Sequence, residues 1–253
     1  MKYYSSKSRE DGISNIAGWE NKVFTPGTKK AKDWKKGRSA ERLADFMLHR
    51  DGEEIIKNEV EKLLKKEVQF CCAIPELEVK FDNYTGTGRV HDLGIYGQLK
   101  TRHNKKIFIG VEAKVDEPFG DKISEVYLGA KTKQLKGINT NAPERTEKLI
   151  RQNFTNIAPQ IFDLKYQFLY STVGTAAVGA DISILLIIVF NTGENNSNYV
   201  KANDEDYQNF IKLSKAEPFG ENAHKMIIEL EDKSGKTLSK ELYLLKIEIE
   251  NPV

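Results

Sequence analysis

Two consecutive segments of this chain alternate apolar with polar residues, which is the pattern of half-buried β-strands. In the second segment, Ile107–Val115, the odd-numbered positions are all apolar, and the opposite face carries Glu112 and Lys114. In the first segment, Val90–Tyr96, the same alternation separates Asp92 from the aliphatic residues. If the apolar faces of the two strands coincide, two carboxylates and an ammonium group converge on the shared polar face.

A polar face of this kind is costly to bury unless its groups pair with one another or bind something. Two carboxylates beside a lysine suit a metal-dependent phosphodiesterase, in which the acids hold the metal. The bare acid-x-lysine triplet is weak support, because it recurs along the chain. Its six occurrences begin at Glu20, Asp33, Glu78, Glu112, Asp163 and Glu231. A solvated sheet face with a cross-strand ion pair is the structural alternative, and spacing alone does not separate the two.

The spacing of apolar residues predicts a core in the order helix, three strands, helix, strand. A first helix begins at Ser39, a candidate N-cap, and ends at Gly52, and a second one follows from Glu53. The later elements are strands Leu77–Phe81, Val90–Leu99 and Ile107–Val115, a long helix from Glu144 to about Val178 with a break near Pro159, and a buried strand Ile182–Phe190. We therefore expect an α/β core with a mixed central sheet over residues 39–191.

The two ends of the chain differ from this core. Residues 1–38 show little periodicity and contain the breaker Pro26-Gly27, so we expect an irregular arm that packs on the core. Residues 118–143 indicate a long loop with one helical piece. Residues 192–253 begin with a polar linker and predict a C-terminal extension, which could contact a substrate or form a homodimer interface. Its elements would be a helix, Asp204–Leu213, and a β-hairpin of His224–Glu231 and Glu241–Glu250.

The net charge of +2 gives no overall polycationic signal for nucleic acid. Two local basic clusters could nevertheless meet phosphates, or could simply be solvated surface. The first comprises Lys29, Lys30, Lys32, Lys35, Lys36 and Arg38, and the second Lys100, Arg102, His103, Lys105 and Lys106. No apolar run approaches the roughly 20 residues that span a bilayer, and no signal peptide is recognisable, so we expect a cytoplasmic protein with no membrane partner.

Asp92 on one strand and Glu112-Ala113-Lys114 on the next resemble the signature of the PD-(D/E)XK nuclease superfamily, which includes restriction endonucleases and recombination nucleases. The superfamily core runs helix, three strands, helix, strand, and the order expected for residues 39–191 is similar. The resemblance implies a restriction endonuclease-like core and a magnesium-dependent nuclease that acts on DNA. Within the superfamily, the segment Val111–Gly120 is most similar to that of a group of bacterial proteins.

The resemblance also implies a role for each matching residue. Asp92 and Glu112 would bind Mg²⁺, for which Mn²⁺ would be a substitute, together with the backbone carbonyl of Ala113. Lys114 would orient the attacking water or help to deprotonate it, and would offset negative charge in the transition state.

Two further positions correspond to supporting residues of the superfamily. An acid on the first core helix corresponds to Glu41, and Asp45 or Glu54 would replace it if the helix register differs. A glutamine on the second core helix corresponds to Gln167, which is followed by Tyr170. A solvated helix position is the structural alternative for this glutamine.

The sequence departs from the superfamily pattern at the residue before Asp92, where His91 replaces the usual proline. By alternation, His91 points to the core-side face, so we expect a structural histidine rather than a catalytic one. Glu117 and Glu125 follow the motif strand, where they would either extend the metal site or be merely exposed.

Two alternatives accompany the expectation of a DNA nuclease. A non-catalytic nucleic-acid-binding or regulatory module could keep the same scaffold without turnover, and the near-neutral net charge favours it. RNA or a small phosphodiester is the alternative substrate to DNA.

Overall fold

The computed structural model describes residues 1–5, 8–24, 34–84, 88–115, 117–191, 197–231 and 235–250. Within these ranges the chain is an α/β protein with one mixed sheet of nine strands, in the order β2-β1-β3-β4-β5-β6-β9-β8-β7. The strands are β1 (Lys2–Ser5), β2 (Ser8–Ile13), β3 (Val68–Val79), β4 (Arg89–Leu99), β5 (Lys106–Lys114), β6 (Ile182–Asn191), β7 (Glu217–Pro218), β8 (Ala223–Glu231) and β9 (Thr237–Glu250). The helices are α1 (Ile16–Val23), α2 (Ser39–His49), α3 (Gly52–Leu64), α4 (Ile123–Leu135), α5 (Ala142–Asn153), the 3-10 helix η2 (Pro159–Asp163), α6 (Tyr166–Ala177) and α7 (Ser197–Ser214).

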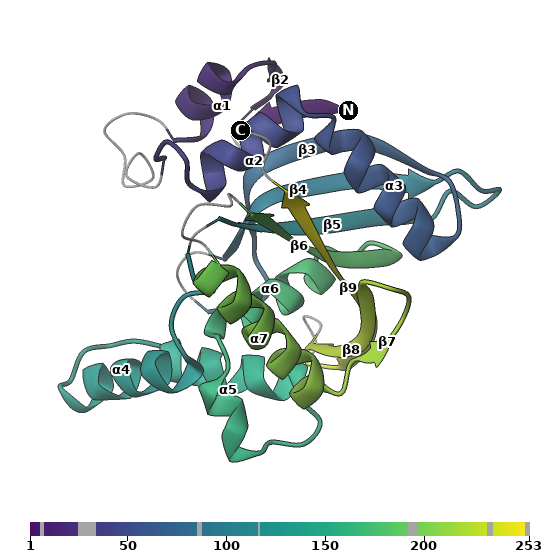
Figure 1. Ribbon diagram of the computed structural model, residues 1–253. Coiled ribbons are helices and arrows are strands. Elements are labelled where there is room, and N and C mark those ends of the chain that lie inside the picture. The colour runs from purple at the N-terminus through teal and green to yellow at the C-terminus, as the bar shows by residue number, and fades with distance from the viewer. Residues whose placement is uncertain are drawn as a thin grey trace.

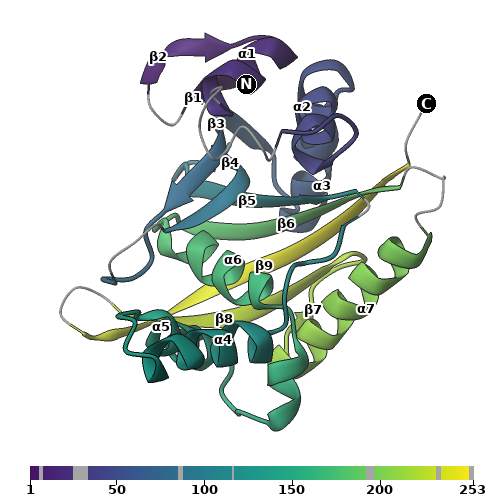
Figure 2. The same ribbon diagram turned by 90° about the vertical axis from the view of Figure 1, so that its left-hand side faces the viewer.

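Helices cover both faces of the sheet, with α1, α2 and α3 on one side and α5, α6 and α7 on the other (Figures 1 and 2). Each side has its own apolar core. Phe46 of α2 packs in the same cluster as Val111 of β5, and Phe168 of α6 and Phe210 of α7 pack with Ile187 of β6. Because both layers pack on β6, this strand is buried over nearly its whole length, as its apolar composition predicts.

The middle of the sheet agrees with the sequence analysis. The strands β3, β4 and β5 form an antiparallel meander, and β6 runs parallel to β5. The expected strands Val90–Leu99, Ile107–Val115 and Ile182–Phe190 are confirmed as β4, β5 and β6, with bounds that differ by one residue. A parallel pair needs a long crossover connection, and the helices between β5 and β6 supply it.

The helices of this crossover differ from the expected single long helix. They are α5, η2 and α6, and the expected break near Pro159 is confirmed because this residue begins η2. Proline cannot donate the backbone hydrogen bond that would continue a helix through this point. The preceding region, expected to be a long loop with one helical piece, contains the 13-residue helix α4.

The expectation of an irregular N-terminal arm is wrong for the residues that the structure describes before Lys35. Strand β1 pairs in parallel with β3, β2 pairs with β1, and Trp19 of α1 is buried in the core of the α2 side. The first 24 residues thus extend the sheet by two strands. Their contribution depends on pairing with a distant strand, which periodicity does not report. Pro26-Gly27 lies outside the described residues.

The strand expected at Leu77–Phe81 begins too late, because β3 starts at Val68 and contains Pro75. In β3 the residue after this proline, Glu76, has a left-handed backbone with φ of 48°. A residue in this conformation breaks the two-residue alternation of a strand. The alternation of apolar and polar residues is therefore interrupted at Glu76, although the hydrogen-bonded strand continues through it. Ser39 is the first residue of α2 rather than its N-cap, which is Arg38.

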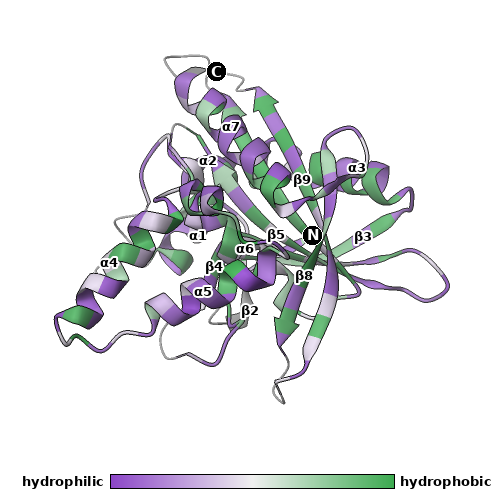
Figure 3. Ribbon diagram, turned by 90° about the horizontal axis from the view of Figure 1, so that it is seen from below, coloured by the Kyte–Doolittle hydropathy of each residue, from purple (hydrophilic) through white to green (hydrophobic). Residues whose placement is uncertain are grey.

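The C-terminal hairpin is part of the same sheet. Strand β9 pairs antiparallel with β8, as expected, and also pairs in parallel with the central strand β6. Green and purple residues alternate along β9 in Figure 3, in keeping with the alternating sequence that predicts this strand. The helix α7 begins at Ser197, before the expected Asp204. The linker residues 192–196 and the turn residues 232–234 lie outside the described ranges.

Among the described residues, no helix combines the length and the apolar composition that crossing a membrane requires.

Close packing of β5 against α6 leads to a first prediction. A Cβ atom added to Gly110 would lie 2.5 Å from Oγ1 of Thr175 and 2.8 Å from Cε1 of His91. Gly110→Ala should therefore lower the free energy of unfolding by about 1–3 kcal/mol in urea denaturation. Gly129→Ala is the matched control, because a Cβ atom at this position on the exposed side of α4 meets nothing within 4 Å. It should stabilise the protein by about 0.5–1 kcal/mol through helix propensity, and equal effects of the two variants would contradict the packing described.

Candidate active site

The structure brings together the residues of the predicted motif at one end of β4 and β5. The two strands run antiparallel, with Leu93 opposite Val111, so the start of β4 adjoins the end of β5. The backbone N–H of Ala113 donates a hydrogen bond to Oδ2 of Asp92 at 2.7 Å. Asp92 is thereby fixed beside the strand that carries Glu112 and Lys114.

Glu112 is the most buried acid of the site, with an exposed fraction of 1%. Its Oε1 accepts hydrogen bonds from Arg89 and from Nδ1 of His91, the latter at 3.3 Å. Its Oε2 accepts a hydrogen bond from Nε2 of Gln167 on α6 at 2.5 Å. Burial would raise the pKa of Glu112, but the neighbouring Arg89, His91 and Lys114 outweigh it and lower the pKa to about 2. Glu112 is therefore ionised at neutral pH and held by three donors.

His91 contradicts the expectation drawn from alternation, because its ring lies against Glu112 and not on the opposite face. The register of β3 and β4 is unchanged here, with Pro75 opposite Leu93 and Leu77 opposite His91, but Glu76 on β3 has a left-handed backbone. The alternation of both strands therefore changes at this point. A structural role as the partner of a buried carboxylate is what the contact shows.

Arg89 is a site residue that the sequence analysis missed. Its guanidinium group pairs with Glu112 and lies 4.2 Å from the ring centroid of Tyr170, which follows Gln167 on α6. Gly174 leaves room for the side chain, because a Cβ atom there would lie 3.1 Å from Cβ and Cγ of Arg89. The only available signal was its position, three residues before Asp92 at the start of a predicted strand.

Asp92 has the opposite electrostatic character to Glu112. Burial, together with the negative charges of Glu112 and Glu76, raises the pKa of Asp92 to about 8, although Lys114 and Arg89 act in the other direction. Asp92 lines a hollow with a volume of about 270 Å³. The other residues around this hollow are Phe24, Lys35, Arg38, Ser39, Ala40, Glu76 and Glu117.

Lys114 is 7% exposed and lies between the motif strand and the loop that follows. Its Nζ is 3.8 Å from Oε1 of Glu117 and 5.5 Å from the ring centroid of Phe119. The same oxygen of Glu117 accepts a hydrogen bond of 2.6 Å from Oγ of Ser39, at the start of α2. Glu117 thus connects the lysine to the helix across the hollow, whereas the sequence left its role open.

The remaining acids are engaged elsewhere. Oε2 of Glu41 accepts a hydrogen bond from the backbone N–H of Gly37 at 3.1 Å, and Glu41 does not line the hollow. Asp45 pairs with Arg50 at 2.6 Å, and the exposed Glu54 lies 3.7 Å from Lys57. Glu125 accepts a hydrogen bond from the backbone of Lys122 and caps α4. The structure therefore gathers Asp92, Glu112, Lys114 and Gln167, but not the acids of α2 and α3.

The oxygen atoms around Asp92 and Glu112 determine whether the site can hold a divalent metal ion. In the part of the chain that the structure describes, no three His, Cys, Asp or Glu side chains form a group that could hold a metal. Two carboxylates and the carbonyl of Ala113, the set implied by the resemblance, offer the hard oxygen atoms that Mg²⁺ prefers. Burial and the negative charges of Glu112 and Glu76 raise the pKa of Asp92, and a bound cation would oppose this shift. These oxygen donors fit the ion, provided that Glu112 exchanges one of its present partners for it.

The family described as "Domain of unknown function (DUF6946)" matches residues 12–251. The chain belongs to this family. No curated protein and no solved structure matches the chain. The family description names no activity.

The two carboxylates lead to a prediction about pH. Because the pKa of Asp92 is raised in the folded protein, its protonated form stabilises the fold. This contribution to the free energy of unfolding is fully present below pH 3.8, the ordinary pKa of the group, and is lost as the pH rises towards about 8. Asp92→Asn keeps an acceptor for Ala113 and removes the charge. The variant should exceed the native protein in free energy of unfolding by about 1–3 kcal/mol at pH 8.5, and by almost nothing at pH 4.

Urea denaturation at the two pH values, without divalent ions, measures this difference. Asp163→Asn, at an exposed acid 3.1 Å from Nζ of the exposed Lys122, is the control and should change stability by less than about 0.5 kcal/mol. An Asp92→Asn effect that is the same at both pH values would show that Asp92 does not lie in the repulsive environment described.

The pair of Arg89 and Glu112 leads to a third prediction. Arg89→Met should lower the free energy of unfolding by about 3–5 kcal/mol, because it leaves Glu112 buried without its main counter-charge. The double variant Arg89→Met/Glu112→Leu should recover much of the loss, since no unpaired charge remains. A double-mutant cycle measured by denaturation checks this, and simple additivity of the two single variants would contradict it.

Proposed function

We propose that this protein is a metal-dependent nuclease that hydrolyses DNA phosphodiester bonds. The single observation that carries the proposal is the convergence of Asp92, Glu112 and Lys114 at the adjoining ends of two antiparallel strands. The two neighbouring acids also differ in pKa, which is raised to about 8 for Asp92 and lowered to about 2 for Glu112. Such a separation is common where two carboxylates have different chemical roles.

The order of elements supports the same proposal. The helices α2 and α3 precede the meander β3-β4-β5, and α5 and α6 precede β6, which pairs in parallel with β5. This is the order helix, three strands, helix, strand, and we propose that residues 39–191 form a restriction endonuclease-like core. Strands β1 and β2 on one side and β9, β8 and β7 on the other extend the sheet around it.

In the proposed reaction, Asp92, Glu112 and the carbonyl of Ala113 would hold Mg²⁺, or Mn²⁺ in its place. The bound ion would supply a Lewis acid and lower the pKa of a water molecule. Lys114, nearly buried beside these acids, would orient this water and offset the negative charge that develops on the phosphate. Gln167 and Arg89 position Glu112 through their hydrogen bonds to its carboxylate, and they themselves would contact neither the water nor the phosphate.

A specific observation favours the second candidate, a non-catalytic nucleic-acid-binding module. Both carboxylate oxygens of Glu112 already accept hydrogen bonds, and Arg89 already supplies a positive charge at this acid. In such a module the arginine would neutralise Glu112 permanently, and Asp92 would bind no magnesium. The two candidates therefore differ in metal binding and can be separated without measuring cleavage.

The cleavage of a labelled DNA duplex in Mg²⁺ tests the leading proposal. Asp92→Asn and Lys114→Ala should each reduce the cleavage rate on the order of 10²–10³-fold, because each removes a charge next to the reacting phosphate. Lys80→Ala is the matched control, since this exposed lysine directly follows β3 and ends the triplet Glu78-Val79-Lys80. Undiminished cleavage in both site variants would remove the assignment of the site.

Thermal unfolding with and without Mg²⁺ separates the enzyme from the module. For the enzyme, millimolar Mg²⁺ should raise the melting temperature of the native protein at pH 8.5 and leave that of Asp92→Asn unchanged. For the module, the two proteins should respond alike.

A further inference from the structure

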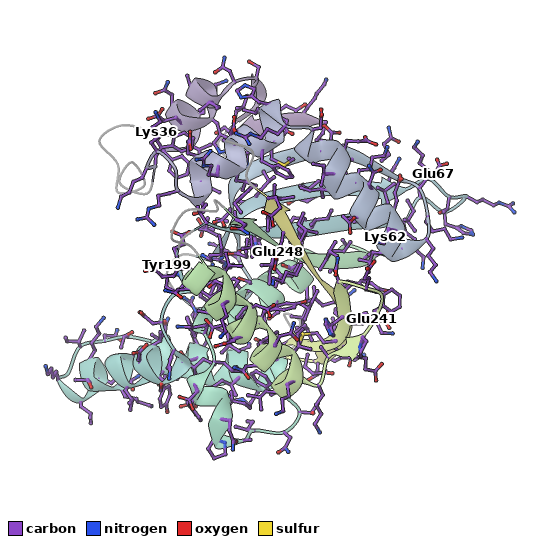
Figure 4. The ribbon with its side chains drawn as sticks, in the orientation of Figure 1. Lys36, Lys62, Glu67, Tyr199, Glu241 and Glu248 are labelled. Atoms are coloured by element: carbon purple, nitrogen blue, oxygen red, sulfur yellow. The ribbon has the colours of Figure 1, made fainter. Side chains whose placement is uncertain are left out.

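The described residues of the two basic clusters lie at opposite ends of the central strands. In the second cluster, Lys100 belongs to the turn after β4, about 26 Å along the strand direction from Asp92. Its backbone N–H donates to the carbonyl of Glu67 at 2.9 Å, so Glu67 marks the same end of the sheet. Figure 4 shows Glu67 and Lys36 on opposite sides of the molecule. Since Lys36 belongs to the first cluster, only one cluster can adjoin the site.

The first cluster adjoins the site through two of its members. Lys35 and Arg38 line the same hollow as Asp92 and Glu117, and both basic side chains are exposed. One wall of the hollow is thus basic and the other acidic. Lys29, Lys30 and Lys32 lie outside the described residues.

Local contacts hold the basic wall in place. The backbone N–H of Arg38 donates to the carbonyl of Lys35 at 3.1 Å, which closes a turn. Gly37 inside this turn donates to Glu41, and Ser39 after it donates to Glu117. The turn is therefore tied to α2 on one side and to the loop after the motif strand on the other. This gives Glu41 a use that differs from metal binding: its carboxylate fixes the turn.

An aromatic contact anchors the segment from the other end. The rings of Phe24 and Trp34 lie 5.1 Å apart, and Phe24, which is buried, also lines the hollow. Trp34 packs at the edge of the apolar core and directly precedes Lys35. Both ends of the turn are therefore anchored, which keeps its backbone beside the hollow that Lys35 and Arg38 line.

We infer that Lys35 and Arg38 bind the phosphodiester backbone of duplex DNA beside the site, and that the cluster around Lys100 does not. The inference rests on the proposed function in taking nucleic acid as the ligand, but it requires no catalysis. The charge arrangement supports it: exposed basic groups neutralise phosphates and release counter-ions, whereas the acids behind them would repel a phosphate that lacks a metal ion. The near-neutral net charge agrees with phosphate binding that is confined to the basic wall of the hollow.

The test is binding of a fluorescently labelled 25-base-pair duplex in EDTA, measured by anisotropy over a range of salt concentrations. Lys35→Ala/Arg38→Ala should weaken binding about 10- to 100-fold at 0.1 M salt and reduce the slope of log K against log salt by about 1.8. Lys100→Ala/Arg102→Ala removes one lysine and one arginine from exposed positions of the other cluster, and is the charge-matched control. It should change neither quantity.

The charge-conserving variant Lys35→Arg/Arg38→Lys should retain the native affinity, which separates loss of charge from loss of fold. Unchanged binding by Lys35→Ala/Arg38→Ala, equal losses in the control, or binding to an RNA duplex alone would overturn the inference. Because turnover is absent in EDTA, a protein that binds DNA through Lys35 and Arg38 but never cleaves it would refute the nuclease while supporting this surface. A protein that cleaves DNA without needing these two residues would do the reverse.

Discussion

The buried negative charge of Glu112 is the constraint on which the arrangement of the site depends. A carboxylate with an exposed fraction of 1% is tolerable only with donors on both oxygens, and these come from Arg89 and His91 of β4 and Gln167 of α6. Neutralising this acid therefore joins the sheet to the helix layer. Gly110 and Gly174 provide the space in which the basic side chains reach it.

Asp92 shows how one site can hold two carboxylates in different states. Burial raises the pKa of Asp92, and so does Glu112, which its own counter-charges keep ionised. Asp92 opens to the hollow, where Glu76 and Glu117 add negative charge and Lys35 and Arg38 add positive charge. The site is thus divided into a paired, closed half and an open half, and any ligand must enter through the open half.

The sequence predicted the parts of the fold that depend on local alternation. It predicted the bounds of β4, β5 and β6 to within one residue, and it correctly predicted that Asp92 lies next to the motif strand β5. It placed His91 on the wrong face, where the left-handed backbone of Glu76 interrupts the alternation of the paired strands, and it missed the first half of β3, where the register shifts between Phe70 and Cys72. It missed β1 and β2 because their position in the sheet depends on pairing with a strand some 70 residues later in the chain.

What the sequence determined by itself is therefore a pair of strands with acids and a lysine on a polar face, because side-chain direction along a strand follows from the backbone period. The tertiary structure alone decided which charges neutralise which acids, since Arg89 reaches Glu112 only where the strands are paired and α6 is packed over them. It also decided which basic cluster adjoins the site. The contact of Ser39 with Glu117 joins residues 78 positions apart, and no local pattern encodes such a contact.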